Sequence, residues 1–395
     1  MHDPPTEEET TPIPLPADRL RGEFPALETG IHLLSHSLGP VPRSARRALL
    51  TYVDLWERQV SEDVWTEHWW DLSGEVGDLI ARVLGGRPGT VQVQPNTSVA
   101  LSTVISCLDL GAGRRRKVVT SALDFPTTGY VWQAQRRSGV EVTIVPSDDG
   151  LTTPMDRLLD AIDESTALVS LSHVSYRSSH RLDPRPIVER ARRVGALVLL
   201  DTYQSAGVLE MDADGWGVDF MIGGTIKWLC GGPSCGYLYV SPDRIPTLEP
   251  RLTGWFAHAE PFLFEHAPMR YDASVRRFAQ GTANVPGLYS CREGLRIVLE
   301  VGLQAIATES RRRTAWLIEA ARQRGFTVNS PAQDGERGGV VMIAVERPGD
   351  IALRLRERGV LVDWRPGVGL RLGPHFFNTD DEVRETLDVL GRLLP

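Results

Sequence analysis

Apolar runs and helical spacings alternate through the middle of the chain. The run at 196–200 is apolar without a break, which is typical of a strand buried on both faces. The pattern predicts seven strands, at 91–94, 118–121, 140–145, 167–174, 196–200, 218–222 and 237–240, with helices at 155–162 and 185–194 among them. Strands that alternate with helices indicate an α/β fold with a mostly parallel sheet and right-handed crossovers.

The regions on either side of this pattern differ from it. Apolar residues recur every three or four positions over 42–84, which predicts helix. Beyond residue 286 we expect one long amphipathic helix through Leu295 and Ile306, then strands at 340–345 and 360–364 around a helix at 351–358. The chain thus divides into a large domain over 19–285 and a smaller α+β domain over 286–395. Residues 1–18, acidic and rich in Pro and Thr, are predicted to be a disordered tail.

The charge and the cysteine content argue against several classes of protein. A formal net charge of −8 does not favour a general nucleic-acid surface. No apolar run reaches the ~20 residues of a membrane span. The N-terminus lacks a signal-peptide pattern, so we expect a cytoplasmic protein. The four cysteines show neither zinc spacing nor a disulfide framework, so no metal site is expected, and Cys230 and Cys235 are interpreted as packing residues.

The chain has two lysines, and they lie in contrasting surroundings. Lys117 closes a run of three arginines and is interpreted as a solvated charge. Lys227 lies between an apolar strand and a glycine-rich turn, where burial would lower the pKa of its amine and make it a nucleophile. Asp201 ends another predicted strand, at the edge where open α/β sheets bind their ligands.

A lysine and an aspartate at two strand ends suggest pyridoxal 5′-phosphate as a cofactor. The Lys227 amine would form a Schiff base with the cofactor, and Asp201 would keep the pyridinium nitrogen protonated. The alternative is a buried ion pair without a cofactor. Such pairs rarely repay their desolvation cost, so the cofactor is the preferred interpretation.

Three motifs resemble the class V aminotransferase family. They are DTYQSAG at 201–207, TIKW at 225–228 and FAQGTAN at 278–284. The family includes cysteine desulfurases, and the chain is most similar to its kynureninases and isopenicillin N epimerase-like members. The resemblance implies the fold of a type I PLP-dependent transferase and an amino-acid substrate. It also implies a homodimer with shared active sites.

The resemblance assigns cofactor contacts to particular residues, with Lys227 as the catalytic residue. Thr97 and Ser98 open a predicted helix after a strand, and free N–H groups at a helix N-terminus also suit a phosphate on physical grounds. Phe125 would stack on the cofactor ring, and Thr282 would reach the phosphate bound by the neighbouring subunit. The remaining implied contacts are Ser178, Asp201, Gln204, Thr225 and Trp255.

On the substrate side, the resemblance implies His36, Ser37, Asn284 and Arg371. Arg371 would bind the α-carboxylate, since a guanidinium suits bidentate recognition. For His36 and Ser37 a purely structural turn is an equal alternative. A nearby aromatic cluster is interpreted either as core or subunit packing or as a lid over a bulky substrate; its members are Trp65, Trp69 and Trp70.

The residues around Lys227 bear on the reaction. Desulfurases need a cysteine on the small domain, and no cysteine follows Cys291, so that reaction is discarded. Gln204 and Ile226 stand where kynureninases carry a histidine and a tyrosine, so hydrolytic Cβ–Cγ cleavage lacks an acid. A thiolate leaves without strong acid help. The preferred hypothesis is therefore β-elimination from a cysteine S-conjugate, by a C–S lyase similar to isopenicillin N epimerase-like enzymes of natural-product pathways.

Several alternatives stay open. The first is a kynureninase-type hydrolase. Decarboxylating deamination, transamination and epimerisation require the same first steps. A dimeric binding protein that keeps the fold without catalysis is a hypothesis of another class.

Overall fold

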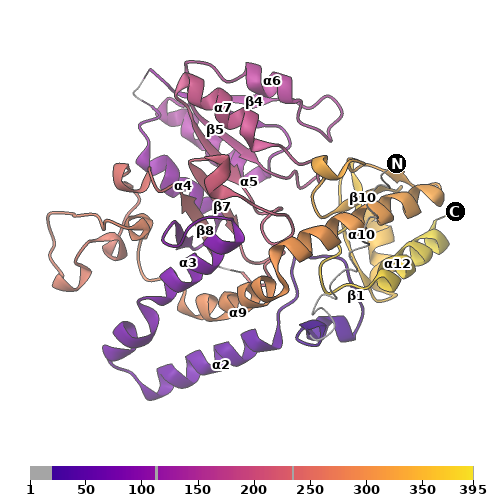
Figure 1. Cartoon of the computed structure of the whole chain (residues 1–395), viewed down its shortest axis with the longest axis horizontal. Coiled ribbons are helices and arrows are strands. Elements are labelled where there is room, and N and C mark those ends of the chain that lie inside the picture. Colours follow the sequence, from indigo (N-terminus) through magenta and orange to yellow (C-terminus); the bar gives the residue numbers. More distant parts are fainter. Residues whose placement is uncertain (1–19, 112–113, 234, 395) are drawn as a thin grey trace, which may run out of the picture.

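The computed structural model describes residues 20–111, 114–233 and 235–394. The predicted tail at 1–18 therefore lies outside the described residues. A large sheet with its helices fills one side of the molecule, and α10 and α12 with strand β10 lie on the other (Figure 1). Within the described residues, no helix is long and apolar enough to cross a membrane.

The large sheet has seven strands in the order β2-β8-β7-β6-β5-β3-β4. Strand β8 runs opposite to the other six strands, so the prediction of a mostly parallel sheet is confirmed. The strands are β2 (Val91–Gln94), β3 (Lys117–Ser121), β4 (Glu141–Val145), β5 (Thr166–Ser172), β6 (Leu197–Asp201), β7 (Phe220–Gly224) and β8 (Gly236–Val240).

Helices cover both faces of this sheet, so successive residues of a strand are buried on opposite faces. Leu199 packs in one apolar core with residues of α4 and α5, whereas Val198 and Leu200 belong to a second core with residues of α3, α7 and α9. This accounts for the unbroken apolar sequence of β6. The helices are α3 (Leu72–Val83), α4 (Thr97–Cys107), α5 (Pro126–Gln135), α6 (Met155–Asp160), α7 (Pro184–Val194), α8 (Ala213–Trp216) and α9 (Val285–Val301).

A separate apolar core lies under a smaller antiparallel sheet of order β12-β13-β10-β9. Its strands are β9 (Thr327–Val328), β10 (Val341–Ala344), β12 (Asp363–Arg365) and β13 (Gly369–Leu372), and its helices are α10 (Leu303–Gln323), α11 (Pro348–Arg356) and α12 (Asp380–Leu393). Ile31 and Leu33 join this core, because β1 (Ile31–His32) pairs in parallel with β11 (Val360–Leu361). The division into domains at residue 285 stays a prediction.

Two predictions about the C-terminal half were wrong in detail. The single long helix is two helices, because Gly302 between α9 and α10 has a φ of +93°, a conformation that interrupts a right-handed helix. The strand predicted at 360–364 is two short strands in different sheets, β11 and β12. The helical region at 42–84 is likewise divided, into α2 (Arg43–Arg58), a π-helical turn (Trp65–Trp69) and α3.

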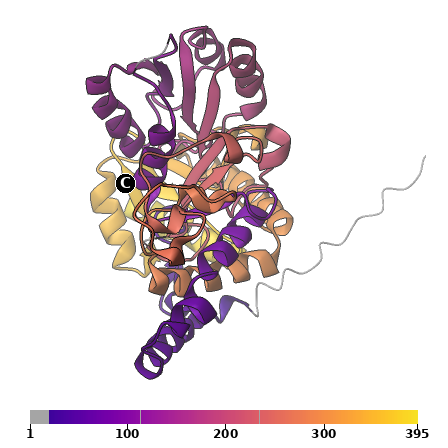
Figure 2. The ribbon, with the colours of Figure 1, turned by 90° about the vertical axis from the view of Figure 1, so that its left-hand side faces the viewer.

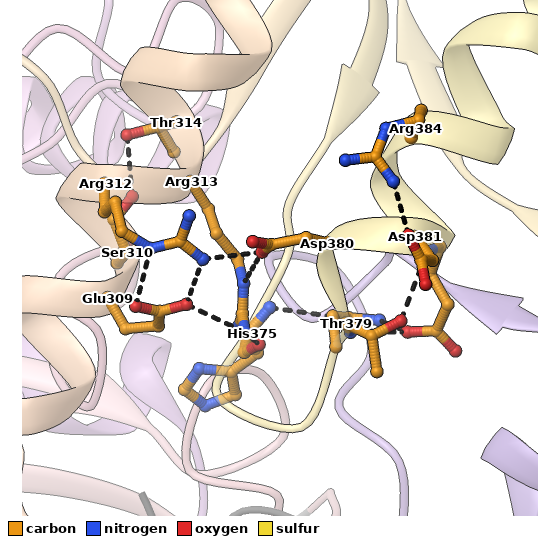
Figure 3. A network of polar contacts seen from close by, with 12 residues as sticks. Glu309, Ser310, Arg312, Arg313, Thr314, His375, Thr379, Asp380, Asp381 and Arg384 are labelled. Atoms are coloured by element: carbon orange, nitrogen blue, oxygen red, sulfur yellow. Dashed lines mark hydrogen bonds and ion pairs between the residues drawn. The ribbon is translucent and has the colours of Figure 1, made fainter. Parts of the chain in front are cut away.

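Helices α10 and α12 are joined by a charged network at the N-terminus of α12 (Figure 3). Arg313 donates to Asp380 over 3.2 Å and to the carbonyl oxygen of His375 over 2.9 Å. Thr379 and Glu382 form a capping box that satisfies the first free N–H groups of α12. Helix α2 packs against α9 and forms the lower edge of the molecule in the side view (Figure 2).

The positive φ of Gly302, which separates α9 from α10, can be tested by substitution. Gly302→Ala should lower the free energy of unfolding by about 1–2 kcal/mol, because a Cβ is strained at positive φ. A Cβ at Gly302 would meet no atom within 4 Å, so crowding does not contribute. Urea denaturation measures the change. Gly335→Ala is the matched control, since Gly335 has equal space without a positive φ, and an equal loss there would contradict the assignment.

Candidate active site

A cavity of about 260 Å³ opens at the carboxyl edge of the large sheet. Ser172 ends β5, and the register pairs it with Asp201, the last residue of β6. Asp201 in turn pairs with Ile222 on β7, so the ends of three parallel strands meet at this edge. The cavity is lined by Asn96, Thr97, Ser98, Phe125, Thr127, Ser172, Val174, Tyr176, Asp201, Tyr203, Gln204 and Lys227.

Lys227 reaches the cavity from the loop after β7. The loop is fixed by main-chain bonds, with the N–H of Gly39 donating to the carbonyl oxygen of Ile226 over 2.8 Å. The amine lies between two aromatic rings, with Nζ 4.0 Å from the ring centroid of Tyr203 and 5.6 Å from that of Phe125. Burial lowers the pKa of the Lys227 amine to about 8, against an opposing effect of Asp201. A neutral, nucleophilic amine is therefore accessible near neutral pH.

Asp201 faces the same cavity as a buried carboxylate. Burial raises the pKa of its carboxyl to about 6, while the N–H of Tyr203, which donates to Oδ1 over 2.9 Å, and the charge of Lys227 favour the ionised form. A second carboxylate, that of the half-buried Asp124, raises the pKa of Asp201 further. At neutral pH Asp201 is thus ionised and can accept a hydrogen bond from a cationic ring nitrogen.

The N-terminus of α4 supplies an anion site on the cavity wall. The side chain of Asn96 caps the helix by accepting a hydrogen bond from the N–H of Val99 over 3.0 Å. Thr97 and Ser98 line the cavity from the first turn of α4. The N–H groups of a first turn have no acceptor within the helix, and the helix dipole favours a negative charge there. This arrangement suits a phosphate group.

Six of the expected cofactor contacts line this cavity, namely Thr97, Ser98, Phe125, Asp201, Gln204 and Lys227. The other four do not. The hydroxyl of Ser178 donates to the carbonyl oxygen of Leu151, and that of Thr225 faces the carbonyl oxygens of Gly232 and Cys235 at 3.1 and 3.2 Å. Trp255 and Thr282 line a separate surface groove.

None of the four expected substrate residues lines the cavity. His36 is fully buried, with Nε2 2.8 Å from Asp363 Oδ1. The N–H of Ser37 donates to the carbonyl oxygen of Leu34 over 2.9 Å, in a turn. Asn284 is the N-cap of α9. Arg371 is buried on β13 beside the cavity, where its Nη1 donates to the carbonyl oxygen of Tyr176 over 3.0 Å.

Sequence reasoning missed several lining residues, of which Tyr203 and Tyr176 are the largest. Tyr203 follows Asp201 by two positions, so an aromatic side chain just past a strand end was the available signal. The rings of Tyr176 and Phe125 meet edge to face with centroids 5.2 Å apart. Asp363, which binds both His36 and Arg371, was also missed, because nothing in its local sequence indicates those partners.

Trp65 and Trp69 of the aromatic cluster line the surface groove, and none of the three tryptophans lines the Lys227 cavity. Trp70 lies 4.6 Å from Phe256 and 4.7 Å from Phe262, measured between ring centroids. None of the four cysteines lines the Lys227 cavity. Cys235 and Cys291 are buried with their sulfurs 3.2 Å apart, as packing partners of the lysine loop and α9.

The fold and this site together are those of a PLP-dependent enzyme of fold type I. The sequence matches the family model described as "Aminotransferase class-V" over residues 41–370. The chain belongs to this class-V aminotransferase family.

The similarity to individual relatives extends over nearly the whole chain. It is 30% identical to "Uncharacterized aminotransferase YcbU" of Bacillus subtilis (strain 168), over 95% of this chain and 97% of that protein. It is 31% identical to a kynureninase of Pseudomonas fluorescens, over 95% and 92%. In structure it is similar to the apo cysteine desulfurase of Thermococcus onnurineus NA1, with a TM-score of 0.84 and 21% identity over 98% and 99% of the two chains. That degree of identity supports the fold alone.

The residues of the cavity fit pyridoxal 5′-phosphate, the cofactor of this family. Lys227 would supply the amine that binds its aldehyde, Asp201 would offer a carboxylate to its ring nitrogen, and the first turn of α4 would hold its phosphate. The fit rests on the chemistry of these donors, since an amine of lowered pKa, an ionised carboxylate and free N–H groups converge in one cavity.

The pKa of Asp201 predicts a pH dependence of stability. The folded pKa of about 6 lies above the reference value of 3.8, so Asp201 contributes stability below pH 3.8 that is lost as pH rises through 6. The loss is about 3 kcal/mol. In urea unfolding of the cofactor-free protein from pH 4 to pH 7, Asp201→Asn should not show this decline and should be the more stable protein at pH 7. Parallel curves for the two proteins would contradict the assignment.

Proposed function

We propose that this enzyme is a C–S lyase that catalyses β-elimination from cysteine S-conjugates in natural-product biosynthesis. The observation that carries the proposal is Ile226, an apolar side chain directly before Lys227 that cannot protonate a leaving group. The acidic side chains that line the cavity are Asp201 and the phenols of Tyr176 and Tyr203. A leaving group that departs as a stable thiolate is compatible with such a site.

The side chains take the following roles in this proposal. Arg371 binds the substrate α-carboxylate, and the amine of Lys227, with its pKa of about 8, removes the Cα proton. Asp201 would hold a proton on the ring nitrogen of the bound cofactor, whose ring would supply the electron sink for the pair left at Cα. The Cβ–S bond then breaks with release of the thiolate, and hydrolysis of the remaining enamine yields pyruvate and ammonia.

A kynureninase-type hydrolase is the second candidate. Two observations favour it: the relatives that are named kynureninase, and the phenol of Tyr203, which lines the cavity beside Lys227. Burial raises the pKa of this phenol, which keeps it protonated at neutral pH. Tyr203 could therefore supply the proton that Ile226 cannot.

We also infer a homodimer in which the two chains share their active sites. Thr282, exposed in the single chain, lies on a groove whose other residues include Trp56 and Val60, which are 52% and 80% exposed. Apolar side chains exposed together in this way are typical of protein interfaces. A second chain seated here would cover them and would place Thr282 at the boundary between the chains.

Product analysis distinguishes the two reactions. Incubation with an S-aryl cysteine should release the aryl thiol, pyruvate and ammonia in equal amounts, while kynurenine should release no anthranilate. Lys227→Ala is the control, since it should lose both the products and the visible absorption of the lysine-bound cofactor. Anthranilate from kynurenine, with no thiol from a panel of S-conjugates, would identify the hydrolase instead.

The homodimer is tested by a charge placed in the groove. Val60→Asp should convert the dimer to a monomer in light scattering and weaken cofactor binding by roughly tenfold or more, because the interface would bury an unpaired charge. Leu353→Asp is the matched control: Leu353 is 53% exposed on α11, outside the groove. A monomeric wild-type protein, or an unchanged dimer in Val60→Asp, would contradict the proposal.

A further inference from the structure

Arg371 already has a carboxylate partner within its own chain. Its Nε donates to Oδ1 of Asp363 over 2.7 Å, and its Nη2 also donates to Oδ2 of Asp363. Its Nη1 donates to the carbonyl oxygen of Tyr176. Asp363 thus occupies the side of the guanidinium that offers Nε and Nη2 as a bidentate pair. Of the five N–H groups of Arg371, two remain for a substrate, one on each Nη nitrogen.

Asp363 is held in place from the opposite side by His36. The ring of His36 is fully buried, and burial together with the charge of Arg371 lowers its pKa to about 3, so the imidazole is neutral. A Cβ at Gly373 would lie 2.3 Å from Nδ1 of His36, and Nδ1 has no partner within the described residues. The ring proton therefore belongs on Nε2, which donates to Oδ1 of Asp363.

The network also controls the charge beside the cavity. Arg365 donates to Oδ2 of Asp363 over 3.1 Å, so two guanidinium groups share one carboxylate. Arg371 and Arg365 lower the pKa of Lys227 and Asp363 raises it, which places all three within electrostatic range of the reacting amine. Their charges sum to one positive charge.

We propose that Asp363 is a specificity-determining residue that restricts the site to amino acids with a single carboxylate. Asp363 orients Arg371 so that two N–H groups of the guanidinium are left for the α-carboxylate. Its negative charge also neutralises one of the two guanidinium charges, so no second positive charge remains to bind a side-chain carboxylate. The substrates that fit are α-amino acids whose side chain carries no carboxylate. The inference rests on the proposed role of Arg371.

The test measures binding, not turnover. The holoenzyme is titrated with L-alanine and with L-aspartate, and the visible spectrum of the cofactor reports each Kd. Wild type should prefer L-alanine. Asp363→Asn should shift the ratio of the two Kd values toward L-aspartate by about tenfold, because one unit of negative charge is removed beside the second carboxylate. Asp363→Glu, which keeps the charge, should retain the wild-type ratio.

Asp334→Asn is the matched control for loss of stability. Asp334 pairs with Arg337, and the side chain of Arg337 is 1% exposed, like that of Arg371. Neither Asp334 nor Arg337 lines the cavity. An unchanged ratio in Asp363→Asn, or the same shift in Asp334→Asn, would overturn the inference. The role of Arg371 is tested separately with Arg371→Lys. If Arg371→Lys binds both amino acids as wild type does, Arg371 is not the carboxylate site of the proposed function. That result would contradict the present inference as well.

Discussion

The site depends on one constraint, the desolvation of two opposite charges, Lys227 and Asp201, at one edge of the large sheet. Asp201 is buried and Lys227 is half-buried; desolvation favours the neutral form of each side chain, while their mutual attraction favours the charged forms. In bulk water neither group would have the reactivity that the cavity gives it. The parallel strands fix the backbone of Asp201, the loop after β7 fixes Lys227, and the rings of Phe125 and Tyr203 lie within 5.6 and 4.0 Å of the amine, measured to the ring centroids.

Much of the large sheet could be predicted from sequence, because strands buried on both faces leave an unmistakable apolar run. The same logic placed Asp201, which ends β6, and Lys227, which lies in the loop three residues beyond the end of β7. Ser178 could not be placed in this way: it lies in a turn where Ser179 has a φ of +67°, and the turn directs the hydroxyl to Leu151 instead of the cavity. The direction of a side chain beyond a strand end depends on the turn, and strand periodicity does not encode it.

The break at Gly302 and the position of Asp363 were beyond sequence reasoning for another reason. A glycine within an apolar helical pattern is compatible with a continuous helix, and only tertiary packing decides that Gly302 interrupts it. Asp363 depends on His36, which lies near the other end of the chain. Through His36, whose carbonyl oxygen accepts a hydrogen bond from Gln204 over 3.0 Å, Asp363 is also joined to the cavity wall. Contacts of this kind become visible only in the folded structure.

The parallel pairing of β1 with β11 bears on the order in which this chain can assemble. Ile31 and Leu33 belong to the smaller core, yet the strand β11 that pairs with β1 is synthesised only after the whole large sheet. On the ribosome these early residues must wait, with their apolar side chains uncovered, while the large sheet between them and their partners is made. The smaller core is therefore completed only after the large sheet has been made, and a fragment that begins at residue 286 would lack Ile31 and Leu33 from that core.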